Sequence, residues 1–237
     1  MMLPSLFIIT VPSDLDDPTY YKLLNLLPDD RVDRIKKFHF RRNALQSLCG
    51  ELISRIRLAE LLGIDMASVE IQRDEFGKPH CVNSCNLYFN VAHSGDLVAA
   101  AFDNKVVGVD IENMRNTDLA IADRFFTKNE SAALKAKPEA DQRDFFFKLW
   151  TLKESFIKAE GKGLSIPLDS FEFDIDNEDN VYFTSLSNER HRTYRFRHYK
   201  TQPGYNCALC SESGNFPQDI IRLGFDYFLT RIVHSGA

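Results

Sequence analysis

The sequence has no long apolar run, few cysteines and no excess of basic residues. No segment approaches the roughly 18 consecutive apolar residues that span a bilayer, so we expect no membrane partner. The net charge of −5 gives no overall positive field, so we expect no nucleic-acid partner, and a phosphate-bearing ligand would need a local basic cluster. The five cysteines are an odd number and nothing marks secretion, so free thiols in a reducing cytoplasm are expected rather than disulfides.

Four of the cysteines form two closely spaced pairs. Cys81 and Cys85, together with Cys207 and Cys210, could in principle supply four zinc ligands. The segment YNCALCS alternates like a strand, however, which places Cys207 and Cys210 on opposite faces. Buried, unreactive cysteine is therefore the favoured interpretation.

Hydrophobic periodicity predicts an α+β fold. The apolar run at 6–11 has no basic flank of the kind found in signal peptides, so it predicts a buried first strand. Apolar residues three and four apart predict one long helix that ends at Gly63 and a second that ends at Gly161. Strand-like segments follow each helix. This repeated order suggests two similar α/β halves, 1–112 and 113–237, which pack together with a site between them.

The stretch KVVGVDIE carries two acidic residues at alternate positions of an expected strand. Val107, Val109 and Ile111 share one face, while Asp110 and Glu112 lie on the other, about 7 Å apart. One interpretation is a half-exposed strand with a polar outer face. The other is a cation site, because neighbouring carboxylates repel each other unless a hard cation such as Mg²⁺ lies between them.

The helix expected at about 142–160 places Glu154 and Lys158 one turn apart, opposite its main apolar stripe. On a solvated face these two residues would form an ordinary i,i+4 pair. Trp150 and Phe147 flank Glu154, however, so the helix is expected to be covered on both sides. Because a partly buried carboxylate needs a partner, Glu154 is a candidate third metal ligand or general base.

Two further places could bind phosphate. The segment DDRVDRIKKF sets Arg31 and Arg34 on one face of a helix, although an ordinary solvated face explains the same pattern. Lys78 lies in the turn FGKPH and His93 just after a strand, at loop positions where ligands are often bound, although a single histidine is more often structural. The segment EGKGLS lacks the full phosphate-loop pattern, and Gly161 is explained as the residue that ends the helix.

Together these segments resemble the 4′-phosphopantetheinyl transferases of the surfactin-synthetase-activating (Sfp-like) type. Both signatures of that family, G-[IV]-D-x-E and W-x-x-K-E-[SA]-x-x-K, are intact here as GVDIE and WTLKESFIK, about forty residues apart. The segments RDEFGKPH, FNVAHSG, RFFTKNE and PGYNCALC extend the similarity along nearly the whole chain. The resemblance implies an α+β fold in which two similar α/β halves pack as a pseudo-dimer, with coenzyme A and Mg²⁺ in the cleft between them.

The resemblance also implies how the acidic residues would act. Asp110, Glu112 and Glu154 would hold Mg²⁺, which also binds the pyrophosphate of the coenzyme, and Lys158 would contact that pyrophosphate. The serine hydroxyl of an apo acyl or peptidyl carrier protein would attack the β-phosphate and release adenosine 3′,5′-bisphosphate. Glu154 would be the base, with a metal-bound water beside Glu112 as the alternative, and Lys158 would stabilise the leaving group.

The basic residues receive roles from the same resemblance. Lys78 and His93 stand at positions that contact coenzyme A phosphates or its nucleotide, and Arg31 and Arg34 align with basic residues that approach the 3′-phosphate. Ala92 departs from the family pattern, in which a serine often precedes the histidine.

The resemblance implies a monomer, because the two halves already supply both sides of the cleft. The basic region 31–42 could meet the acidic helix that is typical of carrier domains. Two other functions use similar residues: a Mg²⁺-dependent phosphohydrolase that acts on a nucleotide-type pyrophosphate, and a non-catalytic coenzyme A-binding protein. Hydrolysis of coenzyme A without an acceptor would identify the first, whereas a pure binder has no need of a partly buried acidic cluster.

Overall fold

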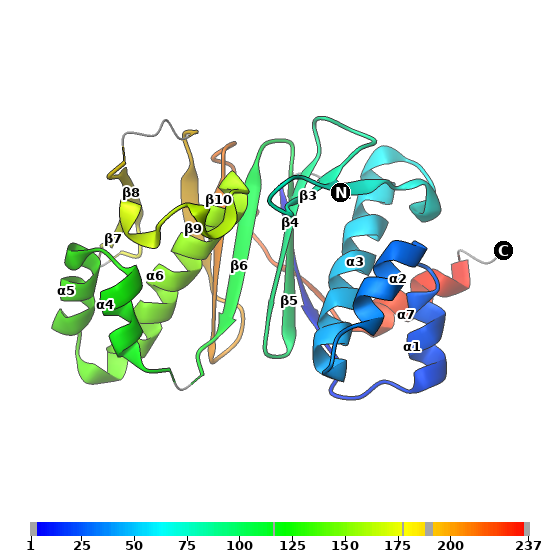
Figure 1. Ribbon diagram of the computed structural model, residues 1–237, viewed down its shortest axis with the longest axis horizontal. Helices are drawn as coiled ribbons and strands as arrows, with labels where there is room; N and C mark the ends of the chain where they lie inside the picture. Colours follow the sequence, from blue (N-terminus) through cyan, green and yellow to red (C-terminus); the bar gives the residue numbers. More distant parts are fainter. Residues whose placement is uncertain (1–3, 116, 177, 188–191, 235–237) are drawn as a thin grey trace.

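Strands occupy the middle of the molecule and helices cover its two outer sides (Figure 1). The computed structural model describes residues 4–115, 117–176, 178–187 and 192–234. Helices and strands are mixed in both halves, so the predicted α+β class is confirmed. None of the helices within these residues is both long and apolar enough to cross a membrane.

The elements follow in an order that repeats along the chain. The first part contains β1 (Ser5–Thr10), α1 (Asp17–Leu24), α2 (Asp29–Lys36), α3 (Arg41–Leu62), η1 (Met66–Ser68), β2 (Ile71–Arg73), β3 (Pro79–Cys81), β4 (Tyr88–Ser94) and β5 (Leu97–Asp103). The second contains β6 (Val107–Asn113), η2 (Leu119–Ile121), α4 (Ala122–Phe125), α5 (Lys128–Ala136), α6 (Glu139–Glu160), η3 (Gly163–Ser165), η4 (Leu168–Ser170), β7 (Phe171–Ile175), β8 (Val181–Ser185), β9 (Arg195–Tyr199) and β10 (Tyr205–Ser211). The strand β11 (Ile221–Leu223) and the helix α7 (Asp226–His234) complete the chain.

The strands form two main sheets that face each other. One sheet has the order β11-β1-β5-β4, and the other has the order β6-β10-β9. All pairs within them are antiparallel except β1 with β11, which is parallel. Two short hairpins, β2-β3 and β7-β8, stand apart from these sheets.

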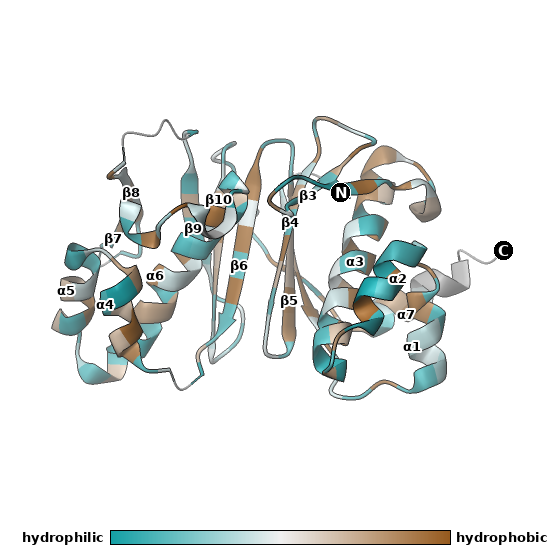
Figure 2. Cartoon of the chain, viewed as in Figure 1, coloured by the Kyte–Doolittle hydropathy of each residue, from teal (hydrophilic) through white to brown (hydrophobic). Residues whose placement is uncertain are grey.

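The alternation of side chains along each strand builds three apolar cores. In β1, Phe7 and Ile9 pack towards α3, while Leu6 and Ile8 pack between the two sheets. The third core, around Phe156, joins α6 to the second sheet. Strand β5, which is largely apolar in Figure 2, is buried along its whole length, because a strand with apolar residues on both faces must be covered on both sides.

Sheet pairing does not follow the expected boundary between 112 and 113. Strand β6 spans that boundary and pairs with β10, and β11 follows the boundary but pairs with β1. The chain therefore crosses between the sheets twice, once between β5 and β6 and once after β10. The division into halves 1–112 and 113–237 stays a prediction. Below, the first half means the sheet β11-β1-β5-β4 with its helices, and the second half means the sheet β6-β10-β9 with its helices.

Both long helices end at the glycines at which the sequence predicts their ends. Gly63 and Gly161 adopt the left-handed conformation, with φ of 68° and 81°, and each donates its backbone N–H to a carbonyl of the last turn. The second helix begins at Glu139, earlier than the expected 142, because Pro138 supplies its N-cap. Helical periodicity before Gly63 belongs to two helices, α2 and α3, rather than to one.

The cysteines are free thiols in the described residues. Cys207 packs between the sheets and Cys210 packs under α6, so the two lie on opposite faces of β10, as predicted. Burial raises the pKa of both thiols, which keeps them protonated and unreactive.

A buried ion pair fixes α6 to the start of α5. Lys153 Nζ lies 2.8 Å from Glu130 Oε2, and each side chain is 1% exposed. The lysine also donates to the carbonyls of Leu168 and Phe171 at 2.8 Å. Glu130 closes a capping box with Thr127 and accepts the backbone N–H of Phe173 at 2.9 Å. Every charge in this cluster is satisfied, which is the condition under which a buried ion pair is tolerated.

We expect Lys153→Ala to lower the free energy of unfolding by about 3–5 kcal/mol, because it leaves the Glu130 carboxylate buried without its cation. Urea unfolding at pH 7 measures the change. Lys135→Ala is the matched control, since Lys135 and Asp123 form a pair in which the side chains are 65% and 52% exposed and such pairs contribute little. Equal midpoints for the two variants would contradict the expectation.

Candidate active site

Strand β6 and helix α6 lie in direct backbone contact. A Cβ placed on Gly108 would overlap the carbonyl oxygen of Ser155 and crowd the backbone of Ala159, so only glycine allows the helix to approach this closely. The contact brings the polar face of β6 against α6. The strand is therefore buried from Val107 through Ile111, and the interpretation of KVVGVDIE as a half-exposed strand is wrong.

Asp110 and Lys158 meet across this contact. Lys158 Nζ lies 2.6 Å from Asp110 Oδ1, and the aspartate side chain is 4% exposed while that of the lysine is 29% exposed. Burial raises the pKa of Asp110 to about 7, although Lys158 opposes the shift. Burial also tends to lower the pKa of Lys158, but Asp110 and the nearby carboxylates outweigh it, so that the lysine pKa is raised and the ammonium stays charged.

Glu112 and Glu154 complete the acidic cluster. Both interact electrostatically with Asp110 and with Lys158. Glu112 Oε2 accepts a hydrogen bond of 2.7 Å from Ser94 Oγ, which comes from β4. Glu154 is partly buried, as expected, and this burial raises its pKa, with Lys158 opposing and Glu112 adding to the shift.

The donor set suits a hard cation. Asp110 Oδ2 is buried and has no hydrogen-bond partner, and the cluster holds three carboxylates for one lysine. Within the described ranges, no group of three or more His, Cys, Asp or Glu side chains is already arranged to hold a metal ion. In this conformation Lys158 supplies the positive charge beside Asp110. Carboxylate oxygens and an unpartnered buried oxygen fit Mg²⁺, which favours such ligands.

A pocket of about 190 Å³ lies in the first half, between α3, the hairpin β2-β3 and β4. Arg34 and His93 both line it, so two of the predicted phosphate-binding residues come together. Burial and the positive charge of Lys158 lower the pKa of His93. The acidic cluster lies close to this pocket, because Ser94, the residue after His93, is 2.7 Å from Glu112.

The pocket carries a surplus of positive charge. Arg31, Arg73 and Arg55 each have a guanidinium nitrogen 3.7 Å from a carboxylate oxygen of Glu51. Partial burial and repulsion from Arg34 and Arg31 lower the pKa of Arg73, although Glu51 and Asp30 oppose the shift. Asp30 pairs with Arg31 at 2.9 Å, so two carboxylates face four guanidiniums. An anion would relieve the repulsion. Sequence reasoning missed Arg73 and Glu51, although Arg73 stands immediately before the turn that contains Lys78.

Lys78 links the two halves. Its Nζ lies 2.5 Å from the carbonyl oxygen of Ala159, at the C-terminal end of α6, where a cation is favoured. Burial lowers the pKa of Lys78 to about 8 despite nearby acidic groups such as Asp74. Lys78 does not line the pocket that contains Arg34 and His93, but its neighbour Pro79 does.

Two side chains of β4, those of Asn90 and Ser94, accept hydrogen bonds from backbone N–H groups on the open edge of β6. Sequence reasoning missed the role of both residues. Asn90 Oδ1 accepts the backbone N–H of Val109 at 2.9 Å, and Ser94 Oγ accepts that of Asn113 at 3.1 Å. The two residues are four apart on one face of a strand, a pattern that becomes visible only once a partner edge is known.

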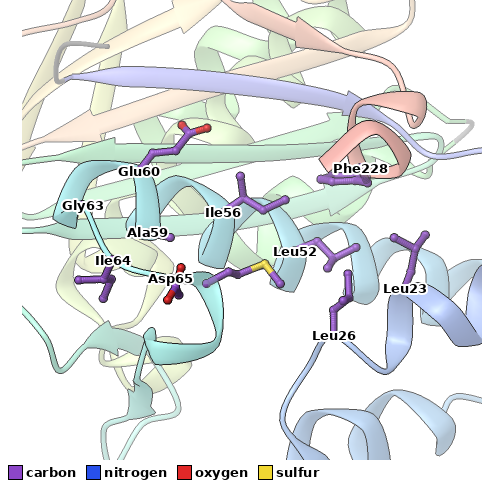
Figure 3. A pocket seen from close by; sticks show the side chains of 11 residues that line it. Leu23, Leu26, Leu52, Ile56, Ala59, Glu60, Gly63, Ile64, Asp65 and Phe228 are labelled. Carbon is purple, nitrogen blue, oxygen red and sulfur yellow. The ribbon is translucent and has the colours of Figure 1, made fainter. Parts of the chain in front are cut away.

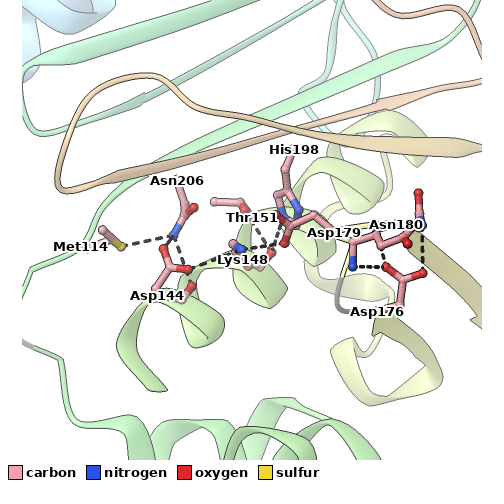
Figure 4. Close-up of polar contacts among 10 residues, drawn as sticks. Met114, Asp144, Lys148, Thr151, Asp176, Asp179, Asn180, His198 and Asn206 are labelled. Atoms are coloured by element: carbon pink, nitrogen blue, oxygen red, sulfur yellow. Dashed lines mark hydrogen bonds and ion pairs between the residues drawn. The ribbon is translucent and has the colours of Figure 1, made fainter. Parts of the chain in front are cut away.

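Two of the other pockets, both away from the predicted residues, are shown in close-up. One of about 340 Å³ is lined by apolar residues of α3, such as Leu52 and Ile56, and by Phe228 of α7 (Figure 3). The other, of about 1010 Å³, lies beside α6, β8 and β9 (Figure 4). Within it, Lys148 pairs with Asp179 at 2.8 Å and with Asp144 at 3.5 Å, so its charge is neutralised.

The depressed pKa of Lys78 has a consequence for stability. The folded state binds the lysine proton less tightly than the unfolded state, in which the pKa is about 10.5. Between pH 8 and 10 the unfolded state therefore holds more protons, and stability rises with pH. We expect the wild type to gain about 1 kcal/mol per pH unit relative to Lys78→Met over this range. Urea unfolding of both proteins at pH 7, 8.5 and 10 measures the difference, and a difference that does not change with pH would contradict it.

Comparison with known protein families covers the chain in two adjoining parts. Residues 16–105 match the model described as 4′-phosphopantetheinyl transferase, N-terminal. Residues 106–210 match the 4′-phosphopantetheinyl transferase superfamily. The junction between the matches lies between β5 and β6, where the chain crosses from one sheet to the other.

Individual relatives extend over most of the chain. The 4′-phosphopantetheinyl transferase ffp of Bacillus subtilis is 37% identical over 209 residues, which cover 88% of this chain and 92% of the relative. The 4′-phosphopantetheinyl transferase Sfp of Bacillus subtilis strain 168 is 33% identical over 208 residues, with the same two coverages of 88% and 92%. By these similarities the chain belongs to the 4′-phosphopantetheinyl transferase family.

Proposed function

We propose that this enzyme transfers the 4′-phosphopantetheine arm of coenzyme A to a serine of an apo acyl or peptidyl carrier protein in a Mg²⁺-dependent reaction. The main support is the meeting of two unlike clusters. A pocket rich in arginine comes from the first half, an acidic cluster with one lysine comes from the second, and His93 and Lys158 interact across the join. A pyrophosphate bound by a cation needs both kinds of partner.

The basic residues would bind the coenzyme. Arg34 and His93 would contact its phosphates from within the pocket, and Arg31 would add charge beside Glu51. Lys78 would reach a phosphate or the nucleotide by exchanging its contact with the carbonyl of Ala159. Burial is the main cause of the lowered pKa of Arg73, and repulsion from Arg34 and Arg31 adds to it. This repulsion supports the assignment, because a bound phosphate would offset it.

Asp110, Glu112 and Glu154 would hold Mg²⁺. The ion would neutralise the negative charge that develops on the pyrophosphate during transfer. The unpartnered Asp110 Oδ2 supports this assignment. Lys158 would then turn from Asp110 towards the pyrophosphate, whose negative charge would favour the ammonium form as Asp110 does in this structure.

The chain's own groups can carry the remaining chemistry. The carrier serine oxygen forms a bond to the β-phosphorus, and the bond from this phosphorus to the oxygen shared with the α-phosphate breaks, which releases adenosine 3′,5′-bisphosphate. Glu154 accepts the serine proton, a role that suits a carboxylate whose pKa is raised by burial. The Lys158 ammonium stabilises the negative charge on the leaving oxygen.

We further propose that the enzyme acts as a cytoplasmic monomer without nucleic-acid or membrane partners. Both clusters belong to one chain, so a second copy is not needed to complete the site. The net charge of −5 gives no general attraction for nucleic acid or for anionic lipid.

The mass of an apo carrier protein, incubated with the enzyme, coenzyme A and Mg²⁺, tests the proposal directly. We expect the carrier to gain the mass of one phosphopantetheine arm, and we expect EDTA to abolish the gain. Consumption of coenzyme A without modification of several carrier types would indicate hydrolysis instead. Unchanged coenzyme A and carrier would indicate binding without catalysis.

Glu154→Gln is expected to lower the turnover number by about 10²-fold or more, because the amide can neither accept the serine proton nor act as an anionic metal ligand. The initial rate of carrier modification measures the loss, and urea unfolding checks that the fold remains. Glu139→Gln, at an exposed position in the first turn of the same helix, is the matched control and should keep normal turnover. Near-normal turnover of Glu154→Gln would rule out the assignment.

A further inference from the structure

We propose that Ser94 is a positioning residue that orients Glu112 for the metal ion and thereby sets the affinity of the site for Mg²⁺. The inference rests on the proposed function, since it assumes that Glu112 is a metal ligand. It assigns a role to a serine of the first half that acts on a carboxylate of the second.

The hydroxyl of Ser94 lies between two neighbouring groups of β6. It accepts the backbone N–H of Asn113 at 3.1 Å and lies 2.7 Å from Glu112 Oε2. A serine hydroxyl has only one proton to donate, and the carboxylate can only accept. The bond from Asn113 fixes where the hydroxyl sits, so its proton holds Oε2 of Glu112 in one place. Oε1 receives no hydrogen bond within the described part of the chain and is free to meet a cation.

The turn that follows Ser94 is held by both halves. The carbonyl of Gly95 accepts bonds from Arg42 Nε at 3.0 Å and Gln46 Nε2 at 2.9 Å, both on α3. From the other side, the backbone N–H of Asp96 donates to Tyr205 Oη at 2.8 Å. Gly95 has φ of 53°, and a Cβ there would overlap the Tyr205 hydroxyl, so the tyrosine fits against the turn only because residue 95 is glycine.

These contacts make Ser94 a rigid support rather than a mobile surface residue. A side chain attached to a turn that is fixed at both ends loses little further entropy when it holds Glu112. Residues that hold a metal ligand in this way typically change metal affinity by 10- to 100-fold when they are removed.

The test compares Ser94→Ala with Ser94→Thr and Ser211→Ala. Ser211 is a matched control because it also lies on a strand and accepts a backbone N–H, from Ser213 at 3.1 Å. It also donates to a carboxylate across the two halves, at 2.8 Å from Asp103 Oδ2. Threonine keeps the hydroxyl at residue 94. Calorimetric titration of Mg²⁺ into each protein saturated with coenzyme A measures metal affinity, and titration of coenzyme A in EDTA measures binding without metal.

We expect Ser94→Ala to weaken Mg²⁺ binding by about 10-fold or more, to leave coenzyme A binding in EDTA within about twofold, and to shift activity to higher Mg²⁺. Ser94→Thr should restore most of the affinity, and Ser211→Ala should bind Mg²⁺ normally. Normal Mg²⁺ affinity in Ser94→Ala, or equal weakening in all three variants, would overturn the role of Ser94 while leaving the transferase function intact. A wild-type protein that modifies the carrier equally well in EDTA would instead contradict the metal-dependent function.

Discussion

The close packing of α6 on β6 is the constraint from which the site follows. Because Gly108 has no side chain, the helix backbone rests on the strand, and Lys158 reaches Asp110 at 2.6 Å. The same contact buries Asp110 and raises its pKa to about 7. A carboxylate so buried needs a cation, and Lys158 supplies it in this structure, a place that the proposed metal ion would take. The glycine of GVDIE is thus a packing residue that brings the acidic residues after it against α6.

The two halves contribute opposite charges to one place. Arginines of the first half crowd around Glu51, while the second half gathers three carboxylates around one lysine. Neither cluster is balanced by itself, and the proposed ligand, an anionic coenzyme with its cation, would stabilise each of them. Asn90, Ser94 and Lys78 hold the halves together at this join, through bonds from the first half to backbone or carboxylate groups of the second.

The order of helices and strands is similar in the two halves, but the pockets beside their long helices, α3 and α6, differ in charge. Gly50 faces Val91 in the first half, and a Cβ at residue 50 would lie 3.0 Å from the valine side chain. Lys148 in α6 is the counterpart of Gly50 in α3, because the two residues lie equally far before the glycines that end their helices. The carbonyl oxygen of Lys148 lies 3.1 Å from His198 Nε2. Where the first half has an open, cationic pocket, the second has a lysine neutralised by Asp144 and Asp179. Side chains, rather than the order of elements, decide which pocket can take an anion.

The sequence by itself determined the fold class, the glycines that end both long helices and the opposite faces of Cys207 and Cys210, because these depend on local periodicity and backbone conformation. Its two signatures also indicated the family that the relatives then showed. Only the tertiary structure decided that Asp110 is buried, that Arg73 joins the basic cluster and that Ser94 holds Glu112. These relations join residues far apart along the chain, and no local pattern encodes them, since they arise when two sheets and a helix meet at one edge of β6.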